Sequence, residues 1–94
     1  VTRTYALGEI PQYMKDDFTL VAISNLCLAD ARFKEGISGA NLDYLARRPF
    51  WERNMDFNHG TGHGVGYLLN VHEGPAGFHW RTRGNSICPF QKVW

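Results

Sequence analysis

The stretch "HGTGHGVGYLLNVHEGP", residues 59–75, decides how this chain folds and what it can bind. It holds three of the chain's four histidines, His59, His63 and His72, and it places a glycine at every second position over residues 60–66. Each of those glycines would cost a helix interior about 1 kcal/mol relative to alanine, so a loop or a distorted strand is expected. Alternating glycines also leave one side of an extended backbone bare, which lets a metal, a substrate or another strand come close. The pattern therefore predicts a crowded site beside His63.

The density of histidines favours metal binding or catalysis over a structural role. A single histidine is as often a packing or surface residue as a functional one, but three in a glycine-rich stretch shift that balance. Neutral imidazole is the commonest nitrogen ligand of divalent metals, and a neighbouring histidine can hydrogen-bond to a substrate carbonyl or carry a proton near neutral pH. We therefore treat the three histidines as candidates for one site.

Two other kinds of site are poorly supported. The dinucleotide-binding pattern G-x-G-x-x-G needs a glycine where Val65 stands, and the P-loop pattern needs a Gly-Lys-Ser/Thr that the chain lacks. None of Ser24, Ser38 and Ser86 lies in a nucleophile-elbow sequence. Nucleotide binding and serine hydrolase chemistry are therefore disfavoured.

The residues before the motif predict a strand followed by two helices. β-branched and aromatic residues predict a strand over residues 1–7, whose pairing partner would lie upstream of this chain. Apolar residues at helical spacing predict one long helix over residues 12–33, buried over much of its girth. Gly36 is expected to break that helix, Ser38 to cap a second one, and Pro49 to end or kink the second helix.

Within the motif itself, the apolar residues over 67–71 predict a short strand. No internal repeat and no linker divides the 94 residues, which is a length that fits one domain with a modest core. The expected fold class is therefore α+β, with two helices and short antiparallel strands.

Charge and composition exclude several partners. The net charge is +1, from ten Lys and Arg against nine Asp and Glu, and the basic residues are dispersed, so no nucleic-acid partner is expected. No apolar run approaches the roughly 20 residues that cross a bilayer, and no signal-peptide pattern opens the chain, so a cytoplasmic protein without a membrane partner is expected. The chain opens without Met, in what resembles mid-strand, and is expected to be an internal piece of something larger.

The histidine stretch resembles the signature of Xaa-Pro aminopeptidases, also called aminopeptidase P, in the pita-bread metallopeptidase family. Two further segments are similar to that family: "VTRT" at the start resembles the residues directly after a metal-binding aspartate, and "GISGANLDYLARRPFW" resembles the helix before the motif. The resemblance runs from residue 1 to about residue 75 and weakens after that. It implies that residues 1–94 are part of a pita-bread catalytic domain, incomplete at both ends.

The resemblance also implies the chemistry of the site. Members of the family hold two divalent metal ions, usually manganese, with zinc or cobalt as alternatives, through two aspartates, one histidine and two glutamates. A bridging hydroxide attacks the carbonyl of the bond that precedes proline. His63 matches the histidine ligand. His59 matches the position that contacts the substrate carbonyl or stabilises the tetrahedral intermediate, and His72 matches a second substrate-binding or proton-handling histidine, so both are expected to be catalytic and substrate-binding.

Only one of the five metal ligands has a match in this chain. The resemblance places both aspartates upstream of residue 1 and both glutamates downstream of residue 94. A single imidazole cannot hold a pair of cations, because carboxylates must offset their charge. The whole protein is expected to be a homodimer that releases the N-terminal residue from peptides with proline in the second position. This chain alone is expected to be inactive.

Two alternatives stay open beside the aminopeptidase. Pita-bread domains also occur without metals as peptide-binding modules, although a module that binds only by shape has no chemical need for three motif histidines. Within the enzymes, prolidase cuts only dipeptides, and methionine aminopeptidase shares the fold. The wording of the motif favours aminopeptidase P over both.

Overall fold

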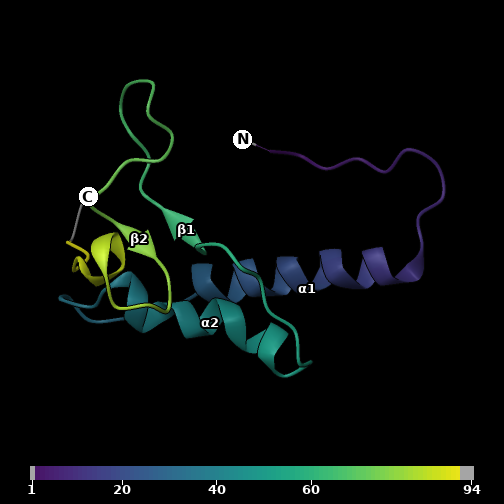
Figure 1. The fold of residues 1–94 in the computed structure, drawn as a ribbon, viewed down its shortest axis with the longest axis horizontal. Coiled ribbons are helices and arrows are strands. Elements are labelled where there is room, and N and C mark those ends of the chain that lie inside the picture. Colours follow the sequence, from purple (N-terminus) through teal and green to yellow (C-terminus); the bar gives the residue numbers. More distant parts are fainter. Residues whose placement is uncertain (1, 92–94) are drawn as a thin grey trace.

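The computed structural model describes residues 2–91, which form two helices, a small sheet and a short 3-10 turn (Figure 1). The elements follow in the order α1 (Gln12–Ala29), α2 (Gly39–Trp51), β1 (Gly62–His63), β2 (Gly77–Phe78) and η1 (Gly84–Ile87). The two strands pair antiparallel. The expected α+β class, with two helices and short antiparallel strands, is confirmed.

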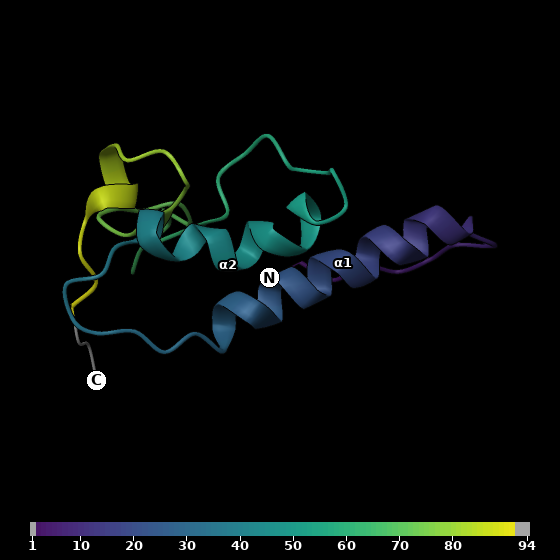
Figure 2. The ribbon, with the colours of Figure 1, turned by 90° about the horizontal axis from the view of Figure 1, so that it is seen from below.

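The core lies between the two helices, which run side by side in both views (Figures 1 and 2). Its buried apolar side chains are Leu20 from α1 and Leu42, Ala46 and Phe50 from α2. The three residues of α2 are four apart, so they form one stripe along the helix. The buried hydroxyl of Ser24 donates to the carbonyl of Ala46 and ties the helices together where side chains are small.

The first helix is shorter and more exposed than the sequence predicts. It ends at Ala29 rather than at residue 33, and Phe33, beyond its end, packs against Phe90 with ring centroids 5.7 Å apart. Only Leu20 and Ser24 are buried along it, since α2 covers one side and leaves other apolar side chains exposed. Neither α1 nor any other helix within residues 2–91 is long and apolar enough to cross a membrane.

The strand predicted over residues 1–7 does not form in the part that the structure describes. Val1 lies outside the described residues, and residues 2–7 run without regular structure (Figure 1). Tyr5 and Leu7 are highly exposed. A strand needs a neighbour to satisfy its backbone groups, and no segment of residues 2–91 pairs with this one.

The second helix begins as predicted and extends past its proline. Ser38 is its N-cap residue, and Oδ1 of Asn41 accepts hydrogen bonds from the Ser38 amide and hydroxyl at 3.1 and 3.0 Å. Of the two outcomes predicted for Pro49, an end or a kink, the end does not occur, because α2 continues to Trp51. Proline in the last turn removes only one backbone hydrogen bond, which a helix held by a packed core tolerates.

The sheet does not use the strand predicted over residues 67–71. Instead β1 pairs with β2, in a register that sets Gly62 opposite Phe78. The predicted strand forms a turn, in which the amide of Gly66 donates to the carbonyl of Asn70 at 2.7 Å and Leu69 adopts a φ of 62°. Residues that turn back on themselves cannot extend into a ladder, so the apolar residues there stay exposed.

Candidate functional site

The site segment begins in the loop between α2 and β1, where His59 lies beside Phe57. The two rings have centroids 4.9 Å apart and are inclined by 30°. Nδ1 of His59 lies 2.7 Å from the carbonyl oxygen of Gly60. A carbonyl oxygen can only accept, so Nδ1 donates and Nε2 keeps the lone pair when the ring is neutral.

His63 ends β1 and uses the same local arrangement. Its Nδ1 lies 2.8 Å from the carbonyl oxygen of Gly64, and the side chain is exposed. The ring nitrogen again donates, which leaves Nε2 as the atom that can bind a metal. A ligating histidine is ordinarily held in this way, with its other ring nitrogen donating to a carbonyl or carboxylate.

The loop after β1 returns His72 to His63. The ring centroids of the two histidines are 4.0 Å apart, and the rings meet edge to face at 77°. The loop closes through the amide of Glu73, which donates to the carbonyl of Gly64 at 3.0 Å. A Cβ atom on Gly64 would overlap the carbonyl oxygen of Glu73, so the close approach of the two chain segments requires glycine. The bare backbone predicted from the sequence therefore serves this loop closure.

The structure thus brings His63 and His72 together and gives His59 a separate setting. The ring of His59 packs on Phe57 at the end of the α2 loop, whereas His63 and His72 contact each other beyond β1. His59 is tied instead to α2, because its carbonyl accepts a hydrogen bond from Nη2 of Arg47 at 2.8 Å.

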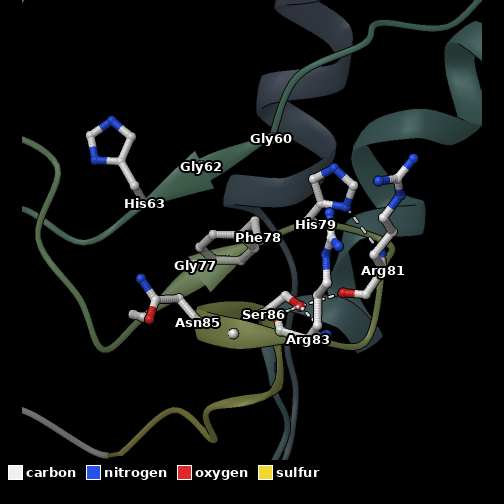
Figure 3. Close-up of a pocket in the computed structure, with 12 residues that line it drawn as sticks. Gly60, Gly62, His63, Gly77, Phe78, His79, Arg81, Arg83, Asn85 and Ser86 are labelled. Atoms are coloured by element: carbon white, nitrogen blue, oxygen red, sulfur yellow. Dashed lines mark hydrogen bonds between the residues drawn. The ribbon is translucent and has the colours of Figure 1, made fainter.

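An open cavity of about 380 Å³ lies between β1, β2 and η1 (Figure 3). His63 stands at one edge of it, and His79 and Arg81 stand at the opposite edge. The amide of Arg81 donates to Nδ1 of His79 at 3.0 Å. The lining of the cavity therefore combines glycine backbone, imidazole and guanidinium groups. The residues that line it are Gly60, Gly62, His63, Ala76, Gly77, Phe78, His79, Arg81, Arg83, Gly84, Asn85 and Ser86.

Three basic residues of this cavity were missed from the sequence. His79, Arg81 and Arg83 follow the motif and carry no recognisable spacing of their own. The two arginines are placed by Ser86 in η1, whose buried hydroxyl shares its single proton between the carbonyls of Arg81 and Arg83. Only the alternation "RTR" could have drawn attention to them.

The loop that carries His59 also contains an acidic residue with a perturbed pKa. Partial burial acts to raise the pKa of Asp56, but hydrogen bonds from the Trp51 side chain, the Phe57 amide and Arg47 outweigh it. The pKa of Asp56 therefore lies below its ordinary value of 3.8. The carboxylate stays charged at neutral pH and helps to fix the loop.

His63 has the orientation that a metal-binding histidine needs. Nε2 of His63 is exposed and oriented by a carbonyl, as a ligand needs to be. Within residues 2–91, however, no three His, Cys, Asp or Glu side chains are grouped so that they could hold a metal ion. A pair of divalent cations needs carboxylates to offset its charge, and His63 alone could offer it only one nitrogen ligand.

Comparison with known proteins places this geometry in context. Residues 1–89 match the model of metallopeptidase family M24. The probable Xaa-Pro aminopeptidase P of Botryotinia fuckeliana is 48% identical over 86 residues, and aminopeptidase P1 of Arabidopsis thaliana is 41% identical over 87 residues. These alignments cover 92% and 93% of this chain, but only 13% and 14% of the two relatives.

A solved structure shows the same arrangement of elements. X-prolyl aminopeptidase from Caenorhabditis elegans, described as a cytosolic enzyme with a di-nuclear active site, is similar with a TM-score of 0.75 and 43% sequence identity. The likeness covers 88% of this chain and 13% of the worm protein. The helices and the small sheet thus correspond to one portion of a much longer fold.

Proposed function

The chain belongs to metallopeptidase family M24, and on that premise we propose that the protein containing it is a metal-dependent aminopeptidase. Its substrate would be a peptide with proline in the second position, from which it releases the N-terminal residue. The observation that carries the proposal is the contact of His63 with His72 at the edge of a cavity. Because Nδ1 of His63 donates to the Gly64 carbonyl, its Nε2 is the nitrogen that can bind a metal. The names of the relatives support the choice of substrate.

In the proposed site, His63 is the nitrogen ligand of a centre that holds two divalent cations. Manganese is the proposed metal, with zinc or cobalt as alternatives. When bound, the cations supply a water of lowered pKa and polarise the carbonyl of the bond before proline. The described residues contribute the imidazole, and the carboxylate ligands would come from chain beyond them.

His59 and His72 would act on the substrate rather than on the metal. Because Nδ1 of His59 already donates to the Gly60 carbonyl, this ring would donate through Nε2 when it is protonated, whereas a neutral His72 ring can donate through one of its two nitrogens. An oriented donor beside a carbonyl stabilises the negative charge that develops on its oxygen. His72 is held edge to face with His63, so a substrate bound beside the metal ligand would also lie beside His72. The protein is further proposed to be cytoplasmic and homodimeric.

The test uses the full-length protein as its gene encodes it, supplied with manganese. Three peptides separate the candidate activities: Ala-Pro-Pro, the dipeptide Ala-Pro, and Ala-Ala-Pro, which has no proline in the second position. Release of alanine from Ala-Pro-Pro, with little from Ala-Ala-Pro, supports the proposal. Cleavage of Ala-Pro alone would indicate a prolidase. Absence of turnover with all three peptides, at full metal loading, would indicate a non-catalytic peptide-binding module.

A further inference from the structure

The guanidinium group of Arg47 lies buried between α2 and the loop that carries His59. Its side chain is 1% exposed, and each of its three nitrogens donates a hydrogen bond. Nε donates to Asp43 at 2.6 Å, and Nη1 donates to Asp56 at 2.9 Å and to the carbonyl of Phe57 at 2.7 Å. Nη2 donates to the carbonyl of His59 at 2.8 Å.

Arg47 reaches His59 by two routes. The first is the hydrogen bond from Nη2 to the His59 carbonyl, which fixes the main chain. The second passes through Phe57, because the guanidinium lies over that ring at 4.0 Å from its centroid, and the ring in turn packs on the imidazole of His59 at 4.9 Å. The Arg47 side chain therefore holds both the main chain of His59, by a hydrogen bond, and its ring, through Phe57.

The Arg47 side chain projects from the packed part of α2. Arg47 follows Ala46 in the middle of α2, and Ala46 and Phe50 are buried in the core between the helices. The planar fork of arginine can donate to two carboxylates and two carbonyls at once, whereas the single nitrogen of lysine cannot reach all four. This set of contacts therefore requires arginine at position 47. Through them, α2 holds residues 56–59 of the following loop in place.

We propose that Arg47 is a positioning residue for His59, holding the main chain and the ring of this histidine against α2. The inference rests on the proposed function, in which His59 acts on the substrate carbonyl. Arg47 itself touches neither substrate nor metal; it acts through His59. Catalysis of this kind depends on sub-ångström placement, so loosening His59 lowers turnover even when the histidine is still present.

Two variants of the full-length protein remove the contacts without leaving a buried charge unpaired. Arg47→Lys keeps the positive charge beside Asp43 but loses the fork. The double variant Asp43→Leu with Arg47→Met replaces the buried ion pair with apolar side chains, an exchange that proteins often tolerate. Arg48→Met is the matched control, since Arg48 is the next residue on α2, is exposed and forms its ion pair with the equally exposed Glu52.

A double-mutant cycle with His59→Ala separates positioning from a general structural role. Arg47→Lys is expected to lower kcat about tenfold or more in the wild-type background, with a smaller effect on KM. In the His59→Ala background the same change is expected to cost less than about threefold, because the residue it positions is absent. Arg48→Met should stay within about twofold in both backgrounds.

A second readout does not depend on activity. In the full-length protein with isotope-labelled histidine, the imidazole signal assigned to His59 through His59→Gln should shift or broaden in Arg47→Lys. It should stay in place in Arg48→Met. If the wild-type protein shows no turnover, the proposed function fails, and this measurement still decides whether Arg47 places His59.

Several results would overturn the inference. One is an Arg47→Lys loss that multiplies in full with that of His59→Ala, as independent effects do. Another is a His59 signal that Arg47→Lys leaves unchanged. Loss of the thermal unfolding transition in both Arg47 variants would also overturn it, because Arg47 would then be needed for the fold as a whole.

Discussion

The imidazole rings of His63 and His72 lie edge to face with centroids 4.0 Å apart, although nine positions separate the two residues in the chain. The contact exists because the intervening loop closes on itself, with the amide of Glu73 donating to the carbonyl of Gly64. A ligand held by His63 therefore lies next to His72. The two histidines form one unit, with separate roles in the proposed reaction.

We expect His72→Ala to lower turnover roughly a hundredfold while the metal content stays at the wild-type level. The reason is that His72 would donate to the substrate and not to the cations. Kinetics on Ala-Pro-Pro and metal analysis of the same full-length preparation check this. Tyr67→Ala, at a fully exposed position of the same loop, is the control and should change neither quantity. Loss of metal from His72→Ala would show that His72 is a ligand.

The glycines of the motif are expected to differ sharply in their tolerance of alanine. A Cβ on Gly64 would overlap the carbonyl oxygen of Glu73, so Gly64→Ala should lower the free energy of unfolding by roughly 2–3 kcal/mol. A Cβ on Gly60 would have its nearest neighbour, the carbonyl oxygen of Phe78, at 3.6 Å. Gly60→Ala should therefore change the free energy of unfolding by about 0.5 kcal/mol or less. Denaturant titrations measure both. Equal losses would show that the loop closure does not explain the alternation.

The loop that carries His59 should loosen in acid through Asp56. Since the pKa of Asp56 in the folded protein lies below its ordinary value of 3.8, its stabilising contribution is complete above that value and is lost as the pH falls through the lower folded pKa. The difference in unfolding free energy between wild type and Asp56→Asn should therefore be largest at neutral pH and shrink below about pH 4. Asp17→Asn serves as the control for removing one carboxylate. A difference that grows in acid would contradict the assignment.

The 94-residue chain alone should not hydrolyse Ala-Pro-Pro above about a thousandth of the rate of the full-length protein, even with excess manganese. No three potential ligands are grouped within residues 2–91, and one imidazole cannot hold two cations. Alanine release by the two proteins at equal concentration measures this. Robust turnover by the isolated chain would mean that the ligands are already present in it.

The sequence predicts those parts of the molecule that short-range patterns determine. Ser38 precedes α2 as its N-cap residue, a position for which serine has a local preference, and the glycines from residue 60 onward disfavour a helix. Family resemblance added the candidate roles of the three histidines. What the resemblance could not supply is that His59 has a setting of its own.

The predictions fail where the local structure depends on contacts between residues far apart in the sequence. The first helix stops at Ala29, and Phe33 beyond it packs on Phe90, a contact that periodicity cannot reveal. The apolar residues at 67–71 have the pattern of a strand, but the segment turns back on itself at Gly66, and within residues 2–91 it joins no sheet. The spacing of Asp43 and Arg47 hints at a helical ion pair, and nothing in it shows that Arg47 also reaches His59. Such effects belong to tertiary structure, and sequence patterns alone do not contain them.

The most direct test of the central claim is the metal content of His63→Ala, measured together with its turnover of Ala-Pro-Pro in the full-length protein. The wild type should carry two divalent ions per chain and release alanine. His63→Ala should stay folded, lose at least one ion and fall to about a thousandth of wild-type turnover or below. A folded His63→Ala protein that keeps both ions and full turnover would show that His63 is not a metal ligand.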